Sequence, residues 1–89
     1  MRTETLTVEY VEQMPEKLRE GVLYVSQRFE VAIHLCACGC GFETVTPFNH
    51  EAGWELSFNG GPTLHPSIGN QKFPCGSHYW VKAGRIVWC

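Results

Sequence analysis

Apolar and polar residues alternate along most of the chain, and a period of two is the pattern of a half-buried β-strand. Near the start, Leu6, Val8 and Tyr10 alternate with threonine and glutamate. Helical periodicity is nearly absent, since residues 14–21 could form a single turn at most. The same alternation predicts further strands at residues 22–26, 29–35, 42–46, 54–58, 78–82 and 85–89.

The strand predicted at residues 29–35 contains a histidine whose position matters for any site nearby. Four apolar side chains share one face of this strand, and Ala32 and His34 lie on the other face with Glu30. His34 shares its face with Cys36, so it could orient a thiolate or line a site. An isolated histidine is more often a surface residue, and we expect His34 at the surface.

One segment breaks the alternation. Residues 64–78, LHPSIGNQKFPCGSH, contain two prolines and two glycines. Connections in compact domains usually run to about 4–6 residues, and long ordered loops are usually functional. We therefore expect a long functional loop in this part of the chain.

These patterns predict an all-β protein, a small antiparallel β domain of six or seven short strands. With 89 residues, the chain makes a single domain, residues 1–89, that buries only about 60–65% of the surface exposed by its unfolded form. A core of this size gives marginal stability. A further constraint, such as a bound metal, is therefore expected to stabilise the domain.

Composition and charge narrow the class of partner. The chain is 44% apolar, which excludes disorder, and its net charge of −2 comes without a basic cluster, which argues against nucleic acid. No run approaches the roughly 20 apolar residues of a membrane span, and the N-terminus lacks the apolar run of a secretory signal. We therefore expect a cytoplasmic protein that binds neither membrane nor nucleic acid. In that reducing compartment, its five cysteines indicate metal binding rather than disulfides.

Four of the cysteines lie in two glycine-flanked clusters. Cys36, Cys38 and Cys40 occupy alternate positions, and Cys75 precedes His78 at C-x-x-H spacing. Zinc takes four such ligands in a tetrahedron, and structural sites commonly draw two from each of two tight turns. The sequence therefore predicts one structural zinc ion that joins the two clusters.

The spacing leaves the set of ligands open. In an extended strand the first and last clustered cysteines would be roughly 13 Å apart, but Gly39 and Gly41 allow the chain to turn. Either two of these cysteines join Cys75 and His78, or all three join Cys75 and His78 is free. Buried cysteines without metal and an iron–sulfur cluster are the remaining alternatives. Cys89, far away in the sequence, is expected to be a bystander.

Several short motifs follow one another in a specific order over nearly the whole chain. They include HLCACGCG at residues 34–41, LHPSIGN at 64–70 and PCGSHYWV at 74–81. Together they resemble a bacterial zinc-binding family described as a domain of unknown function, although the family commonly has proline at the position of Ala37. Some members of that family look encoded beside relatives of ubiquitin-activating and ubiquitin-conjugating enzymes, in operons linked with phage defence.

The resemblance has two implications. The first is that the cysteines hold zinc. The second is that the protein is a serine-type peptidase that processes or deconjugates a ubiquitin-like protein in a bacterial conjugation pathway. The implied partners are that ubiquitin-like protein or its conjugates, together with relatives of the activating and conjugating enzymes.

Ser67 is the candidate nucleophile of such a peptidase. A catalytic serine needs a base within roughly 3 Å and donors that hold the oxyanion. If four cysteines hold the metal, His78 is free to be that base, and backbone amides near Ile68 and Gly69 would hold the oxyanion. The chain contains no aspartate, so no third catalytic group can be identified. The remaining candidates for it are a backbone carbonyl, Asn70, Glu43, Glu51 and Glu55.

The alternative function is non-catalytic. A zinc module could recruit a protein partner through a strand edge or through the long loop, with no reactive serine. That alternative predicts a Cys-Cys-Cys-His site in which His78 is a ligand. The location of His78 therefore separates the two hypotheses.

Overall fold

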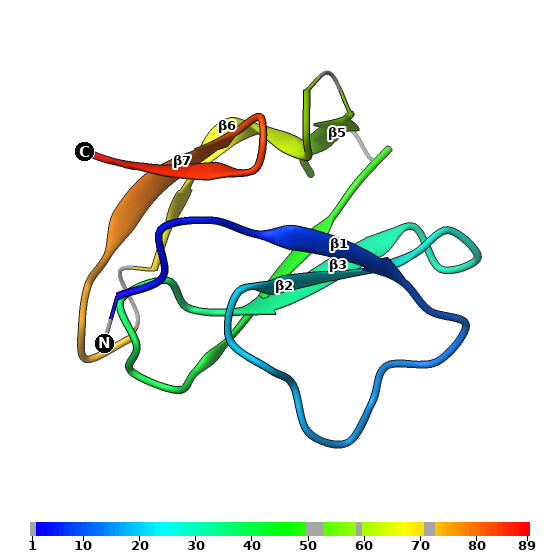
Figure 1. The fold of residues 1–89 in the computed structure, drawn as a ribbon, viewed down its shortest axis with the longest axis horizontal. Helices are drawn as coiled ribbons and strands as arrows, with labels where there is room; N and C mark the ends of the chain where they lie inside the picture. The colour runs from blue at the N-terminus through cyan, green and yellow to red at the C-terminus, as the bar shows by residue number, and fades with distance from the viewer. Residues whose placement is uncertain (1, 50–52, 59, 71–72) are drawn as a thin grey trace.

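The computed structural model describes residues 2–49, 53–58, 60–70 and 73–89. Within these ranges the chain has no helix and forms eight short strands in two four-stranded sheets (Figure 1). The predicted all-β fold class is therefore confirmed, with more strands than expected. The strands are β1 (Thr7–Tyr10), β2 (Val22–Ser26), β3 (Val31–Leu35), β4 (Glu43–Pro47), β5 (Glu55–Ser57), β6 (Thr63–Gly69), β7 (His78–Lys82) and β8 (Arg85–Trp88).

The first sheet contains β1 to β4 in chain order. β1 and β2 are parallel, whereas β2, β3 and β4 pair in antiparallel fashion. The parallel pair is the one departure from the predicted antiparallel arrangement among the described strands. β3 and β4 pair over their full lengths, and the first cysteine cluster occupies the connection between them.

The second sheet contains β5 to β8 in chain order, and all of its pairs are antiparallel. β7 and β8 form the predicted hairpin, in which Lys82 pairs with Arg85. Ala83 and Gly84 connect them with φ angles of 50° and 80°. Two consecutive positive φ angles give the twist that a tight two-residue hairpin turn requires.

Strand β6 corrects the expectation of a long loop, because the first part of that segment pairs with β7. Leu64 lies opposite Val81 and Ile68 opposite Tyr79, so a step of four residues on β6 faces a step of two on β7. The extra residues form an irregularity in the ladder, which includes the cis peptide bond before Pro66. Such a bulge interrupts the alternation by which a strand is identified in a sequence.

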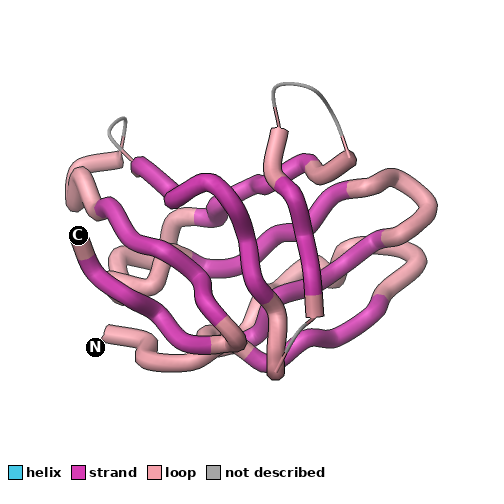
Figure 2. Tube along the Cα trace, turned by 90° about the horizontal axis from the view of Figure 1, so that it is seen from above, coloured by secondary structure: helices cyan, strands magenta, loops and turns pink. Residues whose placement is uncertain are grey.

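The two sheets pack against each other (Figure 2), and their edges are joined differently on the two sides. Where the first sheet meets β8, Thr5 bridges Arg85, and backbone hydrogen bonds of 2.7 and 2.9 Å continue the contact. On the other side a bridge joins Phe48 and Trp54. β5 is so short that it pairs only with Thr63–His65 of β6. The rest of β6 has no strand neighbour on that side among the described residues.

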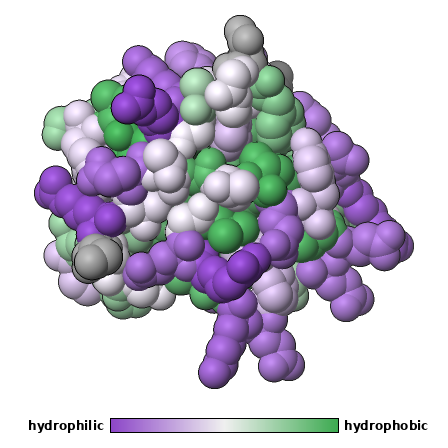
Figure 3. All heavy atoms as spheres, in the orientation of Figure 1, coloured by the Kyte–Doolittle hydropathy of each residue, from purple (hydrophilic) through white to green (hydrophobic). Residues whose placement is uncertain are grey.

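The core between the sheets is lined mainly by aliphatic side chains, together with Tyr79. Hydrophilic side chains project from the periphery, with hydrophobic ones visible between them (Figure 3). Burial of this apolar surface supplies the main stabilisation of the fold, at about 25 cal/mol per Å². The largest fully buried apolar side chains of this core are Tyr79, Leu23, Leu64, Ile68, Val25 and Val81.

His34 lies in this core, so the expectation that it is a surface residue is wrong. Its exposed fraction is 0%, as is that of Ala32 on the same face of β3. The apolar residues of β3 on the opposite face are only half-buried. A buried imidazole requires a hydrogen-bond partner, and the hydroxyl of Tyr79 lies 2.7 Å from His34 Nε2.

Candidate active site and metal centre

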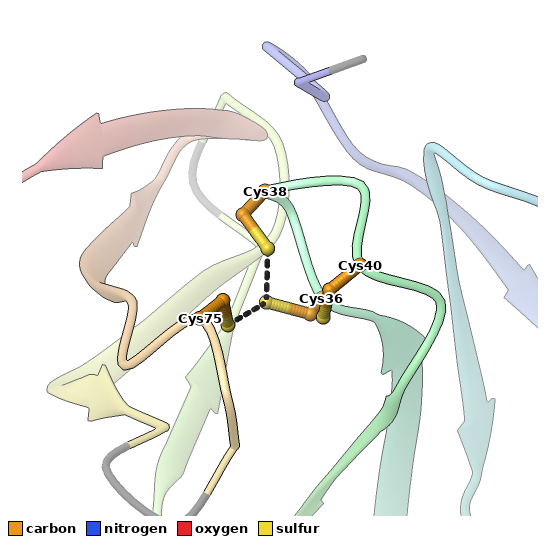
Figure 4. A group of neighbouring side chains, drawn as sticks. All are labelled: Cys36, Cys38, Cys40 and Cys75. Carbon is orange, nitrogen blue, oxygen red and sulfur yellow. Dashed lines mark hydrogen bonds between the residues drawn. The ribbon is translucent and has the colours of Figure 1, made fainter.

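Four cysteine side chains converge from two distant parts of the chain (Figure 4). Cys36, Cys38 and Cys40 follow β3, and Cys75 lies shortly before β7. Their sulfur atoms all lie within 4.8 Å of one another. The Cys36 sulfur is 3.5 Å from that of Cys38 and 3.8 Å from that of Cys75.

A tight turn brings the first three cysteines together. The Gly39 N–H donates to the carbonyl of Cys36 at 3.1 Å. Gly39 and Gly41 have φ angles of 89° and 87°, a region in which residues with a Cβ are strained. The predicted role of these glycines in turning the chain is therefore confirmed.

The sulfur positions fit a tetrahedral metal ion. Zinc–sulfur bonds of about 2.3 Å place the ligands of a tetrahedral site about 3.8 Å apart, close to the shorter distances in this cluster. Of the two ligand sets allowed by the sequence, this is the four-sulfur one. His78 lies outside the sulfur group and contacts Ser67 instead. The arrangement therefore differs from the Cys-Cys-Cys-His site that the non-catalytic alternative predicts.

Two polar side chains contact the Cys36 sulfur, and a third supports one of them. Ser77 Oγ lies 3.0 Å from it, and the Asn70 amide donates to it at 3.4 Å. The same amide contacts Ser77 Oγ at 3.1 Å, and the Thr44 hydroxyl donates to the Asn70 carbonyl oxygen at 3.5 Å. Hydrogen bonds of this kind orient metal ligands and stabilise their charge. The sequence suggested Asn70 as a partner of the candidate base His78, but its amide contacts the cysteine cluster instead.

The thiols of the cluster differ in acidity. Hydrogen bonds from the hydroxyl and backbone of Ser77 lower the pKa of Cys75 to about 6. Loss of solvation raises the pKa of Cys38 to about 12 and also raises the pKa of Cys40. Metal ions bind the thiolate form, and four thiolates this close together repel one another without a cation. The donor set therefore fits a divalent metal with a preference for sulfur, such as zinc.

Ser67 and His78 form a second cluster on the outer surface of the other sheet. Ser67 Oγ lies 2.8 Å from His78 Nε2. Ser67 belongs to β6 and is half-buried, whereas His78 begins β7 and is exposed. Gly69 pairs directly with His78, and a Cβ added at Gly69 would lie 3.9 Å from the imidazole Cδ2. The absence of a side chain there leaves open space beside the ring.

The two clusters are linked through the first residues of β7. His78 is three residues from Cys75, and the next residue, Tyr79, is buried. The Tyr79 hydroxyl accepts a hydrogen bond from the Ala37 N–H at 3.4 Å and lies 2.7 Å from His34 Nε2. Ala37 stands between two of the clustered cysteines. The cysteine turn is thus connected to the strand that carries His78, and His34 has a structural role that we missed in the sequence.

A third group next to His78 is not found among the described residues. Their hydrogen bonds give the His78 ring one side-chain partner, Ser67. Glu43 and Glu55 are exposed residues of β4 and β5, and Glu51 lies outside the described residues. Within the described parts of the chain, the arrangement is a serine–histidine dyad.

Burial of His34 predicts that the protein loses stability in acid. Burial lowers the pKa of His34 from 6.5 to about 4. Between pH 6.5 and about pH 4, His34 is protonated in the unfolded chain but neutral in the folded one, so the unfolded chain binds more protons. The free energy of unfolding contributed by His34 should therefore be fully present above pH 6.5 and be lost as the pH falls to about 4, a decrease of about 3 kcal/mol.

Urea unfolding of the wild type and of His34→Asn over this pH range measures the decrease. Protonation of the thiolates weakens metal binding in both proteins, so the difference between their curves isolates the histidine. Identical pH dependence in the two proteins would contradict the prediction.

A family comparison adds to this geometry. Residues 10–89 match the model of a family described as "bacterial ubiquitination-like system serine protease (BubE)". The chain belongs to this family. At the level of this family description, the expectation of a serine-type protease linked to ubiquitin-like conjugation is confirmed. A role in phage defence and a cytoplasmic location stay predictions. No curated protein and no solved structure matches the chain.

A serine protease of the BubE family requires a serine hydroxyl next to a base. Among the described serines, Ser67 is the one whose hydroxyl contacts a histidine ring. Ser77 contacts the cysteine cluster, and Ser26 accepts a hydrogen bond from a backbone N–H. In the described part of the chain, no helix is long and apolar enough to cross a membrane.

Proposed function

We propose that this BubE family member is a serine-type peptidase that processes or deconjugates a ubiquitin-like protein. Ser67 is the nucleophile, and His78 is the general base and acid. The observation that carries the proposal is the 2.8 Å contact between Ser67 Oγ and His78 Nε2. Such a contact is the first geometric requirement for activating a serine.

The proposed reaction proceeds in two balanced halves. Ser67 Oγ attacks the carbonyl carbon of the scissile bond while its proton passes to His78 Nε2. The tetrahedral intermediate collapses, His78 returns the proton to the leaving group, and the acyl group stays on Ser67. A water molecule then attacks the acyl-enzyme, gives one proton to His78, and releases the carboxylate as Ser67 recovers its proton.

The pairing of β6 and β7 supports Gly69 as the oxyanion donor. The Asn70 N–H donates to the Ser77 carbonyl at 2.7 Å, so Gly69 and His78 form a non-hydrogen-bonded pair of the antiparallel ladder. The Gly69 N–H therefore points away from β7 and can be directed at substrate. By the same alternation the Ile68 N–H points toward β7, while the Ile68 side chain anchors the strand in the core.

The metal has a structural role in this proposal. Zinc held by Cys36, Cys38, Cys40 and Cys75 would link the turn after β3 to the segment that precedes His78. A four-thiolate site has no open position for water and is a weak Lewis acid. The chemical steps therefore depend on Ser67, His78 and the backbone.

Covalent labelling tests the dyad without a protein substrate. A fluorophosphonate reacts with activated serine hydroxyls, so we expect a single label on Ser67, located by peptide mass spectrometry. Replacing His78 with asparagine removes the base and should slow labelling by roughly a hundredfold or more. His65→Asn, which changes another exposed histidine of the same sheet, is the matched control. Equal labelling rates for the His78 variant and the wild type, or a label on another residue, would argue against the dyad.

A further inference from the structure

A surface groove lies between the two sheets, next to the dyad. β5 covers only the first residues of β6, and β4 is the outer strand of its own sheet. Beyond β5 the groove separates β4 from the end of β6, and its volume is about 440 Å³. It is lined by Glu43, Thr44, Val45, Trp54, Ile68, Gly69, Asn70 and Phe73.

The walls of the groove are largely apolar. Val45 is 50% exposed although it lies in a regular strand. Phe73 stacks on Phe42 with ring centroids 5.1 Å apart, and Phe42 is itself 46% exposed. Trp54 packs against the core on the other side. An apolar side chain placed here would lose contact with water on several sides, which is the usual source of affinity in such sites.

The groove also offers backbone hydrogen-bonding groups that the described residues leave unused. The backbone N–H and carbonyl of Gly69 point away from β7, as argued above, and Gly69 lines the groove. An unpaired strand edge of this kind binds an extended peptide through main-chain hydrogen bonds.

The groove adjoins the dyad through Ile68 and Gly69, although Ser67 and His78 are not among its lining residues. Gly69 belongs to its lining and lies directly opposite His78, and Ile68 follows Ser67 in β6. A second hollow of about 310 Å³, lined by Tyr10 and Arg28 among others, belongs to the β1–β2 edge and contains no residue adjacent to Ser67 or His78 in the sequence or in the strand pairing. Position therefore favours the groove between β4 and β6 as the substrate site.

We propose that this groove binds the extended peptide segment of the substrate that contains the scissile bond. The segment adds to the open edge of β6, hydrogen-bonds to Gly69, and places an apolar side chain against Val45, Trp54 and Phe73. Val45 is thereby a specificity-determining residue. The inference rests on the proposed function, because it places the cleaved bond at Ser67.

Replacing Val45 with arginine tests the site. Val45 is 50% exposed, so the longer side chain can be accommodated without unfolding, and it places bulk and charge at the rim of the groove. We expect kcat/KM for a synthetic peptide spanning the cleavage site of the ubiquitin-like precursor to fall by roughly tenfold or more, a loss of about 1.4 kcal/mol. Fluorophosphonate labelling of Ser67 should be unchanged, since it requires only the dyad.

Val87→Arg is the matched control, because Val87 is 42% exposed on β8, the edge strand at the far side of the sheet that contains β6. It should cleave the peptide like the wild type. Cleavage by Val45→Arg at the wild-type rate would overturn the groove while leaving the dyad intact.

Binding of the same peptide to Ser67→Ala separates failure of the groove from failure of the catalytic proposal. Chemical-shift changes at Val45 and Gly69 on titration support the groove even if the wild type does not cleave. Saturable binding that leaves both signals unchanged would overturn it, as would the absence of binding.

Discussion

Ser67→Ala should abolish cleavage of the ubiquitin-like precursor, with a loss of roughly a thousandfold or more in kcat. The Ser67 hydroxyl is the proposed nucleophile, and water would have to replace it without being positioned by His78. Removal of one member of a catalytic serine–histidine unit typically costs several orders of magnitude. Gel-based cleavage assays and mass spectrometry of the products measure the effect.

The fold should be unaffected by this substitution. Ser67 is half-buried and its side-chain contact is with an exposed histidine, so the free energy of unfolding should change by less than about 1 kcal/mol. Ser57→Ala, at an exposed position of β5, is the control and should cleave normally. Undiminished cleavage by Ser67→Ala would remove the proposed nucleophile.

Cys36→Ser should remove the metal and unfold the domain. The Cys36 sulfur is fully buried and contacts two other cysteines, Ser77 and Asn70. A hydroxyl is a poor zinc ligand, and structural metal sites contribute several kcal/mol or more to folding. We expect zinc content to fall from one ion per chain to near zero, and cooperative thermal unfolding to be lost.

Cys89→Ser is the control for the loss of a thiol. Cys89 is exposed and lies outside the sulfur group, so this variant should keep both metal and fold. His78→Ala should also keep its zinc, because the histidine contacts Ser67 rather than the sulfurs. Loss of zinc from His78→Ala would instead favour the Cys-Cys-Cys-His site of a non-catalytic module.

Metal binding and catalysis should be coupled, because one short segment contains both Cys75 and His78. Removal of zinc by a chelator should release this segment, and fluorophosphonate labelling of Ser67 should decrease as zinc is lost. Ser67→Ala, in contrast, should leave zinc content unchanged. We therefore expect loss of the metal to disturb the dyad, and loss of the single Ser67 hydroxyl to leave the metal in place.

Local patterns in the sequence predicted most of the strands. The alternating residues of β2, β4 and the β7–β8 hairpin identify these elements, because the period of two depends only on neighbouring residues. The prediction failed at β6, where a register shift between Leu64 and Ile68 hides the alternation. It also placed His34 on the wrong side of the protein, because period alone does not say which face of a strand is covered.

By itself, the sequence determined that the protein is all-β and that two glycine-flanked groups of cysteines could share one ion. Both conclusions depend on local spacing and on the flexibility of glycine. Only the tertiary structure decided that His78 contacts Ser67, eleven residues away, and that His34 contacts Tyr79, 45 residues away. These contacts depend on the register between strands and on the packing of one sheet against the other, which bring together residues that no local pattern connects.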